Sequence, residues 1–180
     1  MTATFSVLTA IGALVFVPLY PVPVTLQTLF TYLSGAFLGP WLGALSQVIY
    51  ITLGGIGFPI FAGGKAGFAT LAGPTGGYLF GFIAASFAIG KTCDLKNHPP
   101  AARIAGSFVL GTLIIYTLGV LQLSHWMSGN LQNAVAVGLL PFIIGDVAKI
   151  AIGVAVATRL RGILPRADVS SFKRDYLRSL

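Results

Sequence analysis

The feature that most constrains this chain is a long stretch that is almost free of charge. Between Arg103 and Arg159 only two side chains are charged, Asp146 and Lys149. These two residues are three positions apart, so a helix places both of them on one face. An acid and a base inside an apolar helix are costly unless each is satisfied, and they therefore mark a candidate functional site.

The composition extends this constraint to the whole chain. Of the 180 residues, 56% are hydrophobic and 8% are charged, whereas a soluble domain carries about 25% charged residues. The four acidic residues are all Asp, and they cannot cover a soluble surface of this size. Because apolar segments of about 20 residues cross a bilayer as helices, the sequence predicts an all-α polytopic membrane protein.

Six apolar segments fill most of the chain and leave no room for a second folded domain. We expect a six-helix transmembrane domain over residues 1–163 and a basic cytoplasmic tail over residues 164–180. The start of the chain lacks the basic region of a cleaved signal, so we expect the first segment to stay as a transmembrane helix. Breaks fall at proline and glycine, as at Gly39-Pro40. The six predicted helices cover residues 3–19, 24–38, 41–53, 75–92, 104–123 and 142–160.

The basic residues gather in two places. Of eleven Lys and Arg residues, six lie at or beyond Arg159 and three lie from Lys91 to Arg103. Cytoplasmic segments of membrane proteins carry such an excess of positive charge. We therefore expect both termini to be cytoplasmic, in a multi-pass protein of the plasma membrane. No nucleic-acid partner is expected, because these charges flank apolar helices instead of lining one folded face.

Residues 54–77 are unusually rich in glycine. The segment contains nine glycines and two prolines together with several large apolar residues, so we expect it to fold back as a packed lid. Glycines such as Gly63 and Gly64 would let the backbone approach a ligand closely. The segment has neither a dinucleotide-binding fingerprint nor a Walker lysine, so nucleotide binding is not supported.

The predicted orientation places three connections with almost no charge on the outer side, above Asp146 and Lys149. This arrangement predicts a pocket for a small polar solute, with the carboxylate accepting N–H groups and the ammonium donating to an oxygen. In an alternative interpretation, the ion pair only holds the last helix against its neighbours. The candidate secondary contacts are Gln27, Gln47, Tyr50, Gly63, Gly64, Thr75, Tyr78 and Asn130.

The residues that catalysis would need are missing. The single Cys93 permits no internal disulfide, and the two histidines belong to no metal-binding motif. Ser124 and His125 are adjacent, which does not make their side chains face each other. We therefore predict that the chain is not an enzyme. A proton-coupled carrier using Asp146 is a more plausible alternative than a membrane hydrolase, although the internal repeats typical of such carriers are not evident.

Five motifs follow one another in a recognisable order. They are Pro-Val-Pro-Val-Thr-Leu-Gln-Thr-Leu (21–29), Gly39-Pro40 with Gly43-Ala44-Leu45, Gly-Gly-Ile-Gly-Phe-Pro-Ile-Phe-Ala-Gly-Gly (54–64), Gly-Pro-Thr-Gly-Gly-Tyr-Leu-Phe-Gly-Phe (73–82) and Pro141 followed by Gly-Asp-Val-Ala-Lys (145–149). Together they resemble the BioY family of biotin transporter substrate-binding subunits. The resemblance extends from the first predicted helix to the last.

The resemblance implies the six-helix fold of the S component of an energy-coupling factor (ECF) transporter. Such subunits bind biotin beneath their outer loops and join a membrane coupling subunit with two ATPases. The ATPases hydrolyse ATP, so no cofactor is expected in this chain. The Asp and Lys of the family match Asp146 and Lys149. The sequence leaves open whether the ureido ring or the valerate carboxylate of biotin meets Lys149.

S components also resemble one another in an Ala-xxx-Ala motif on the first helix, which packs on the coupling subunit. This chain lacks strict Ala pairs at that spacing, and the corresponding docking candidates are Ser6, Thr9, Ala10 and Ala13. Lys65 inside the glycine-rich segment is also atypical, and either contact with the biotin carboxylate or exposure to solvent would explain it. Two other functions stay open: an S component for another vitamin, and a stand-alone proton-coupled carrier.

Overall fold

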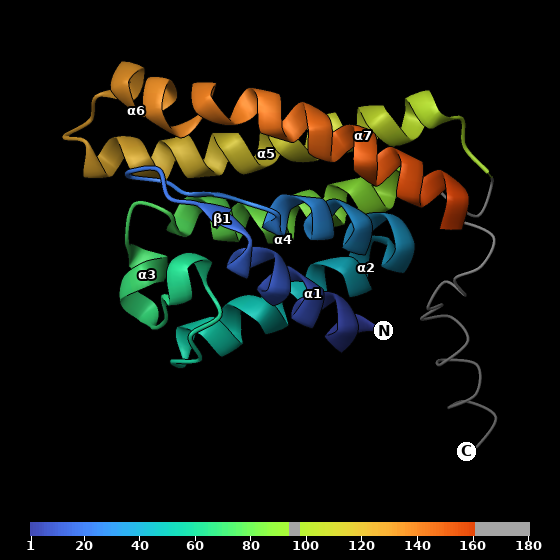
Figure 1. Ribbon diagram of the computed structural model, residues 1–180, viewed down its shortest axis with the longest axis horizontal. Coiled ribbons are helices and arrows are strands. Elements are labelled where there is room, and N and C mark those ends of the chain that lie inside the picture. The colour runs from blue at the N-terminus through green and yellow to red at the C-terminus, as the bar shows by residue number, and fades with distance from the viewer. Residues whose placement is uncertain (94–97, 161–180) are drawn as a thin grey trace.

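The computed structural model describes residues 1–93 and 98–160. The predicted tail, residues 164–180, lies outside the described residues. The chain is mainly helical, as the long apolar segments predicted (Figure 1). Its main helices are α1 (Thr2–Leu14), α2 (Gln27–Gly55), α4 (Gly76–Thr92), α5 (Ala101–Trp126) and α7 (Ile143–Leu160), and the shorter ones are α3 (Phe68–Ala72), α6 (Leu131–Gly138) and the 3₁₀ turns η1 (Ala62–Gly64) and η3 (Leu140–Phe142).

Helix α2 folds back on itself at the predicted Gly39-Pro40 break. Gly39 has φ 80° and ψ −176°, a conformation that glycine adopts without a steric penalty. The Nε2 atom of Gln47 lies 3.1 Å from the Oγ atom of Ser34, whereas thirteen residues of straight helix would separate them by about 20 Å. The two arms of α2 therefore correspond to the two helices predicted over residues 24–38 and 41–53.

The first helix is shorter than predicted. We expected helix to residue 19, but α1 ends at Leu14 and a small antiparallel hairpin follows. Its strands are β1 (Phe16–Val17) and β2 (Val24–Thr25), with Phe16 opposite Thr25. β-branched and aromatic residues suit a strand, and the prolines between the two strands prevent a helix. The hairpin lies at the end of the molecule where α3 also lies (Figure 1).

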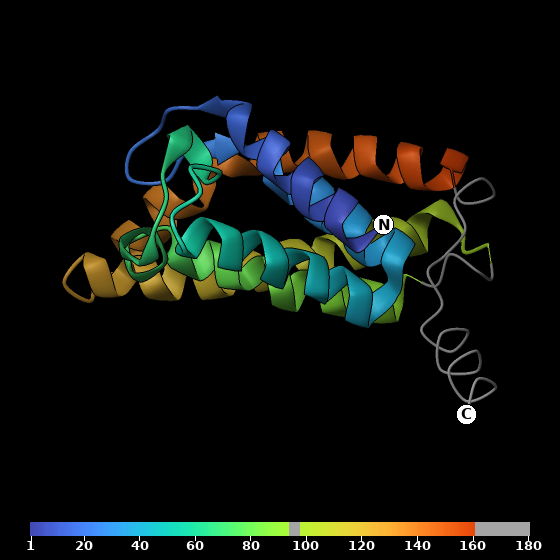
Figure 2. The ribbon, with the colours of Figure 1, turned by 90° about the horizontal axis from the view of Figure 1, so that it is seen from below.

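Glycines allow α4 to pack closely between α2 and α5. A Cβ atom at Gly35 of α2 would lie 2.4 Å from the backbone oxygen of Ser86 in α4. A Cβ atom at Gly81 of α4 would lie 2.9 Å from the Cα atom of Ile115 in α5. Small residues permit such close helix contacts in membrane proteins. Helix α7 covers the other side of this group, along α2 and α5 (Figure 2).

Three helical stretches of the described chain are long and apolar enough to cross a membrane: Gln27–Gly55, Ala101–Trp126 and Leu131–Leu160. The first of these is the folded helix α2, so each of its arms has about half of the 29 residues. The last is interrupted at Leu139, between α6 and η3.

Candidate functional site

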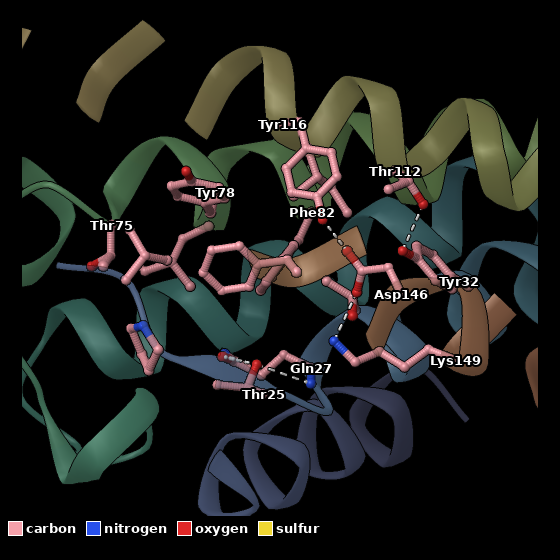
Figure 3. A pocket seen from close by; sticks show the side chains of 16 residues that line it. Thr25, Gln27, Tyr32, Thr75, Tyr78, Phe82, Thr112, Tyr116, Asp146 and Lys149 are labelled. Carbon is pink, nitrogen blue, oxygen red and sulfur yellow. Dashed lines mark hydrogen bonds and ion pairs between the residues drawn. The ribbon is translucent and has the colours of Figure 1, made fainter. Parts of the chain in front are cut away.

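A cavity lies between α2, α4, α5 and α7, next to the β1–β2 hairpin. Measured together with its opening to the surface, its empty space is about 560 Å³. Figure 3 shows Thr75 and Tyr78 towards one end of the cavity, Asp146 and Lys149 towards the other, and Phe82 between them. The cavity therefore has two chemically different ends joined by an apolar middle.

The inner end holds a buried charged group, which we call the Asp146 cluster: Tyr116, Asp146 and Lys149. The Nζ atom of Lys149 donates to Oδ1 of Asp146 at 2.8 Å. The hydroxyl of Tyr116 donates to Oδ2 of the same carboxylate. Asp146 and Lys149 are each 5% exposed. Because they are three positions apart, both lie on the same face of α7. The turn η3 directly precedes α7 and ends at Phe142, which lines the cavity.

Hydroxyl and amide groups surround the Asp146 cluster. The hydroxyls of Tyr32 and Thr112 lie 2.7 Å apart. Gln27 accepts a hydrogen bond from Thr25 at 2.9 Å through Oε1. The hydroxyl of Thr28 also lines the cavity, next to the hydroxyl of Tyr32. These polar groups lie beside the Asp146 cluster, where a ligand can contact them.

Apolar side chains form the middle of the cavity. Leu79, Phe82, Ile115 and Phe142 contribute to its wall. The aromatic ring of Tyr78 also lines it, while its hydroxyl is fixed by donation to the backbone oxygen of Gly138 at 2.8 Å. Such a wall favours a ligand with an apolar body and a polar end.

The glycine-rich segment is packed against the helices only in part: Phe61 and Leu71 are buried, whereas Phe58 and Phe68, which were expected to pack, are exposed. Phe61 is 1% exposed and meets the ring of Tyr50 edge to face, with 5.6 Å between the ring centroids. Tyr50 also donates to the backbone oxygen of Ile60 at 3.1 Å. On the α5 side, Trp126 donates to the backbone oxygen of Ala72 at 2.9 Å. These contacts hold both halves of the lid in place.

Five of the ten predicted binding residues line the cavity and five do not. Those in its wall are Gln27, Thr75, Tyr78, Asp146 and Lys149. Those outside its wall are Gln47, Tyr50, Gly63, Gly64 and Asn130. Tyr50 is linked to the site through Gln27, because Nε2 of Gln27 donates to the Tyr50 hydroxyl at 2.5 Å.

Gln47 lies in a separate buried group, which we call the Gln47 cluster: Thr9, Thr31, Ser34, Ser46 and Gln47. Its Nε2 atom donates to hydroxyls of Thr9, Ser34 and Ser46 at 3.3, 3.1 and 3.1 Å. Its Oε1 atom accepts from Thr31 at 3.4 Å. All five residues are buried. The cluster joins α1 to both arms of α2, so its geometry is that of a packing contact.

Gly63, Gly64 and Asn130 are exposed and serve local turns. Gly63 and Gly64 have φ values of 71° and 72°, and the Gly64 N–H donates to the backbone oxygen of Phe61 at 3.0 Å. Asn130 is the N-cap of α6, where Oδ1 accepts from the Asn133 N–H at 2.9 Å. The glycines shape a tight turn in the lid, and the asparagine begins a helix.

The docking candidates on α1 mostly face the interior. Ser6, Thr9 and Ala13 are at most 4% exposed, and Ala10 is half-buried. Ser6 donates to the backbone oxygen of Ser46 at 2.7 Å. The small residues of α1 therefore pack against α2 in this chain, and docking of a coupling subunit through them stays a prediction.

Sequence reasoning missed several residues of the site. Tyr116 is the most important, because it binds Asp146 directly. Its signal was weak but present: Thr112 and Tyr116 are polar residues four positions apart in an otherwise apolar segment, which places both on one helix face. Tyr32 was missed as well, although it lies on the arm of α2 that carries Gln27.

The chemistry of the site is that of binding. Within residues 1–93 and 98–160, no group of three His, Cys, Asp or Glu residues could hold a metal ion. The Asp146 cluster combines a hydrogen-bond acceptor, an ammonium with further N–H groups and a phenol. It can therefore recognise a small molecule that presents both donors and acceptors.

Comparison with known proteins identifies the family. The sequence pattern that defines the BioY family matches residues 1–166. The chain belongs to the BioY family. It is 41% identical to a biotin transporter BioY of Thermotoga maritima, over 87% of this chain and 91% of that protein. It is 40% identical to a probable biotin transporter BioY of Pyrococcus horikoshii, over 90% and 94% of the two chains.

The fold agrees with a BioY-family assignment. The structure is similar to the crystal structure of the S-component for biotin from an ECF-type ABC transporter, with a TM-score of 0.82. Sequence identity is 28%, and the match covers 89% of this chain and 88% of the other. These findings confirm the predicted family and the S-component fold. Since the relatives are named as transporters, they also support the prediction that the chain is not an enzyme.

Proposed function

We propose that this chain is the biotin-binding membrane subunit of an ECF-type transporter. The observation that carries the proposal is the Asp146 cluster, a buried and charged group that lines the cavity. The similarity to BioY transporters and to a biotin S component supports biotin as the ligand. Alternative vitamins and a stand-alone proton-coupled carrier receive no comparable support.

The ureido ring of biotin suits the inner end of the cavity. Its ureido ring has two N–H donors and one carbonyl acceptor. Asp146 accepts from Lys149 and Tyr116, and a carboxylate has about four lone-pair positions, so it can accept ureido N–H groups in addition. Asp146 is the only hydrogen-bond partner of Lys149 among the described residues, which leaves ammonium N–H groups for the ureido carbonyl.

The apolar parts of biotin suit the middle of the cavity. Its sulfur-containing ring and the methylene groups of its side chain would contact Leu79, Phe82 and Ile115. Burial of apolar surface contributes about 25 cal/mol per Å². The polar inner end would then set the orientation of the ligand, and the apolar walls would contribute most of the buried area.

The proposal includes six membrane spans with both termini in the cytoplasm of a plasma-membrane protein. The spans would be α1, the two arms of α2, α4, α5 and α7. The basic residues Lys91, Arg103 and Arg159 support this orientation, because the ends of α4 and α7 and the start of α5 lie at the same end of the molecule (Figure 1). The lid and the hairpin lie at the opposite end, which would face outward.

Transport requires partners that provide energy, and we include a membrane coupling subunit and two ATPases in the proposal. Because Ser6, Thr9 and Ala13 are buried, we expect the partner to contact the opposite, exposed face of α1. That face carries the exposed apolar residues Val7, Ile11 and Leu14. The chain itself is proposed to use no cofactor, since ATP hydrolysis would belong to the partner subunits.

Calorimetric titration of the detergent-purified chain tests the function directly. Biotin should bind saturably with one molecule per chain, and thiamin and riboflavin should give no binding heat under the same conditions. Binding of thiamin or riboflavin without binding of biotin would replace the proposal with an S component for another vitamin. Biotin uptake that persists in cells lacking every coupling subunit and ATPase would favour a stand-alone carrier.

A further inference from the structure

Three adjoining hollows, which together we call the path, lie between the surface and the Asp146 cluster. The main cavity shares Gln27 and Thr75 with a second hollow of about 280 Å³. The second hollow shares Lys65, Thr70 and Thr75 with a third, more open hollow of about 430 Å³. We call this third hollow the mouth. Thr75 lines all three, so the hollows adjoin one another along one side of the lid.

The mouth carries one charge. Among the described residues, Lys65 is the only charged one that lines the second hollow or the mouth, and it is exposed. In the part of the chain that the structure describes, the only ion pair is that between Lys149 and Asp146. Lys65 therefore has no acidic partner there, and its positive charge is not neutralised locally.

The backbone around Lys65 is held in place. The backbone oxygen of Lys65 accepts from the Phe61 N–H at 3.0 Å, and Phe61 is buried under Tyr50. Thr70 donates its hydroxyl to the backbone oxygen of Ala66 at 3.0 Å. The ammonium can move on its flexible side chain, but its point of attachment is fixed beside the path.

The inner end of the cavity is a less favourable place for the carboxylate of a ligand than the mouth. Lys149 is already neutralised by Asp146 at 2.8 Å, so a second carboxylate placed there would face the negative charge of Asp146. Burying such a charge without a partner of its own costs several kcal/mol or so. A ligand with a neutral polar ring and an anionic tail is therefore accommodated best with the ring inward and the tail towards Lys65.

We propose that Lys65 captures the carboxylate of the ligand at the mouth and keeps it directed outward after binding. This inference rests on the proposed function, because it takes biotin as the ligand. It assigns the ureido ring to the Asp146 cluster and the valerate carboxylate to Lys65. A charge at the rim of a site acts mainly on the association rate and its salt dependence, so the effect of Lys65 is kinetic as well as energetic.

Binding kinetics of two related ligands test this role. Biotin and biotinamide share the ring and the side chain, but only biotin carries the negative charge. Stopped-flow association would be measured for the unaltered chain, for Lys65→Gln and Lys65→Arg, and for Lys91→Gln as a matched control. Lys91 is also an exposed lysine, but it lies at the end of α4 away from the lid.

Lys65→Gln should slow the association of biotin by about tenfold at low salt and remove most of its dependence on salt. The association of biotinamide should be unchanged, Lys65→Arg should restore the rate for biotin, and Lys91→Gln should have no effect. An unchanged rate for biotin in Lys65→Gln, or an equal loss for biotin and biotinamide, would overturn the role of Lys65. Failure of the unaltered chain to bind either ligand would instead contradict the proposed function and this inference with it.

Discussion

Two buried polar groups of this molecule look alike in the sequence but differ in the structure. The Gln47 cluster and the Asp146 cluster both interrupt apolar helices, and both are buried. The Gln47 cluster is neutral, and protein groups surround its central amide on α1 and both arms of α2. The Asp146 cluster is charged and borders the cavity.

The difference shows that a buried polar side chain in an apolar helix is not by itself a binding signal. A hydrogen-bonded amide surrounded by protein specifies how helices pack. A charged group beside a cavity still has hydrogen-bonding capacity that a ligand can use. The following changes should therefore affect binding at the Asp146 cluster and stability at the Gln47 cluster.

Asp146→Asn should have the largest effect on binding. The neutral amide leaves Lys149 without a counter-charge and loses acceptor capacity for the ligand, so the Kd for biotin should rise by about ten- to a hundredfold, or about 1.4–2.8 kcal/mol. Titration calorimetry measures this change, and thermal unfolding without biotin checks that the variant is folded. A Kd equal to that of the unaltered chain would remove Asp146 from the site.

Tyr116→Phe should have a smaller effect on the same cluster. It removes one hydrogen bond to Asp146 and keeps the ring in the cavity wall. A hydrogen bond to a charged group contributes about 1.5–3 kcal/mol, part of which a repositioned carboxylate recovers. We therefore expect a loss of affinity of about three- to tenfold. Thr117→Val is the matched control, because Thr117 is the next residue on α5 but is exposed; an equal loss in both variants would contradict a specific role for Tyr116.

Gln47→Leu should change stability but leave binding almost unaltered. The substitution leaves the hydroxyls of Thr9 and Ser34 without their amide partner, which should lower the free energy of unfolding by about 1–3 kcal/mol. Thermal unfolding should show a lower transition temperature, while the Kd for biotin should stay within about twofold, or about 0.4 kcal/mol. A large loss of affinity in a folded variant would mean that the two clusters are coupled and would break the comparison.

Asn130→Ala should have the smallest effect. Asn130 caps α6 through Asn133 and lies outside the cavity, and removal of such a cap costs about 1 kcal/mol. We expect a slight decrease in the unfolding temperature and an unchanged Kd. Weaker binding of biotin would show that the outer connection between α5 and α7 takes part in the site.

The helices were predictable because their signals are local. Apolar length defined the main helices, and Gly39-Pro40 marked the reversal within α2. The hairpin between α1 and α2 was not predicted, because the run Val15-Phe16-Val17 is compatible with either a helix or a strand. Its strand pairing with Val24 and Thr25 depends on residues that are distant along the chain.

The site was predictable only in part, and for a related reason. Asp146 and Lys149 stand out because charge is rare in apolar segments. Gln27 and Gln47 cannot be told apart by composition: the reversal of α2 directs one to the cavity and the other to α1. Tyr116 was missed because its partner lies thirty residues away and on another helix.

Small residues on α1 illustrate the same limit. The spacing of Ser6, Thr9 and Ala13 allows close approach by another helix, but it does not say whether that helix belongs to the same chain. In the structure it is the second arm of α2, where Ser6 meets Ser46. Short-range spacing predicts that a contact exists, and only the fold identifies the partner.

A crystal structure of the chain with biotin tests the central claim most directly. The account predicts biotin in the cavity between α2, α4, α5 and α7, with the ureido ring in hydrogen-bond contact with Asp146 and Lys149. It also predicts the carboxylate on the side of Thr75 and Lys65. Biotin bound elsewhere, with this cavity empty and the Asp146 cluster unchanged, would contradict the account.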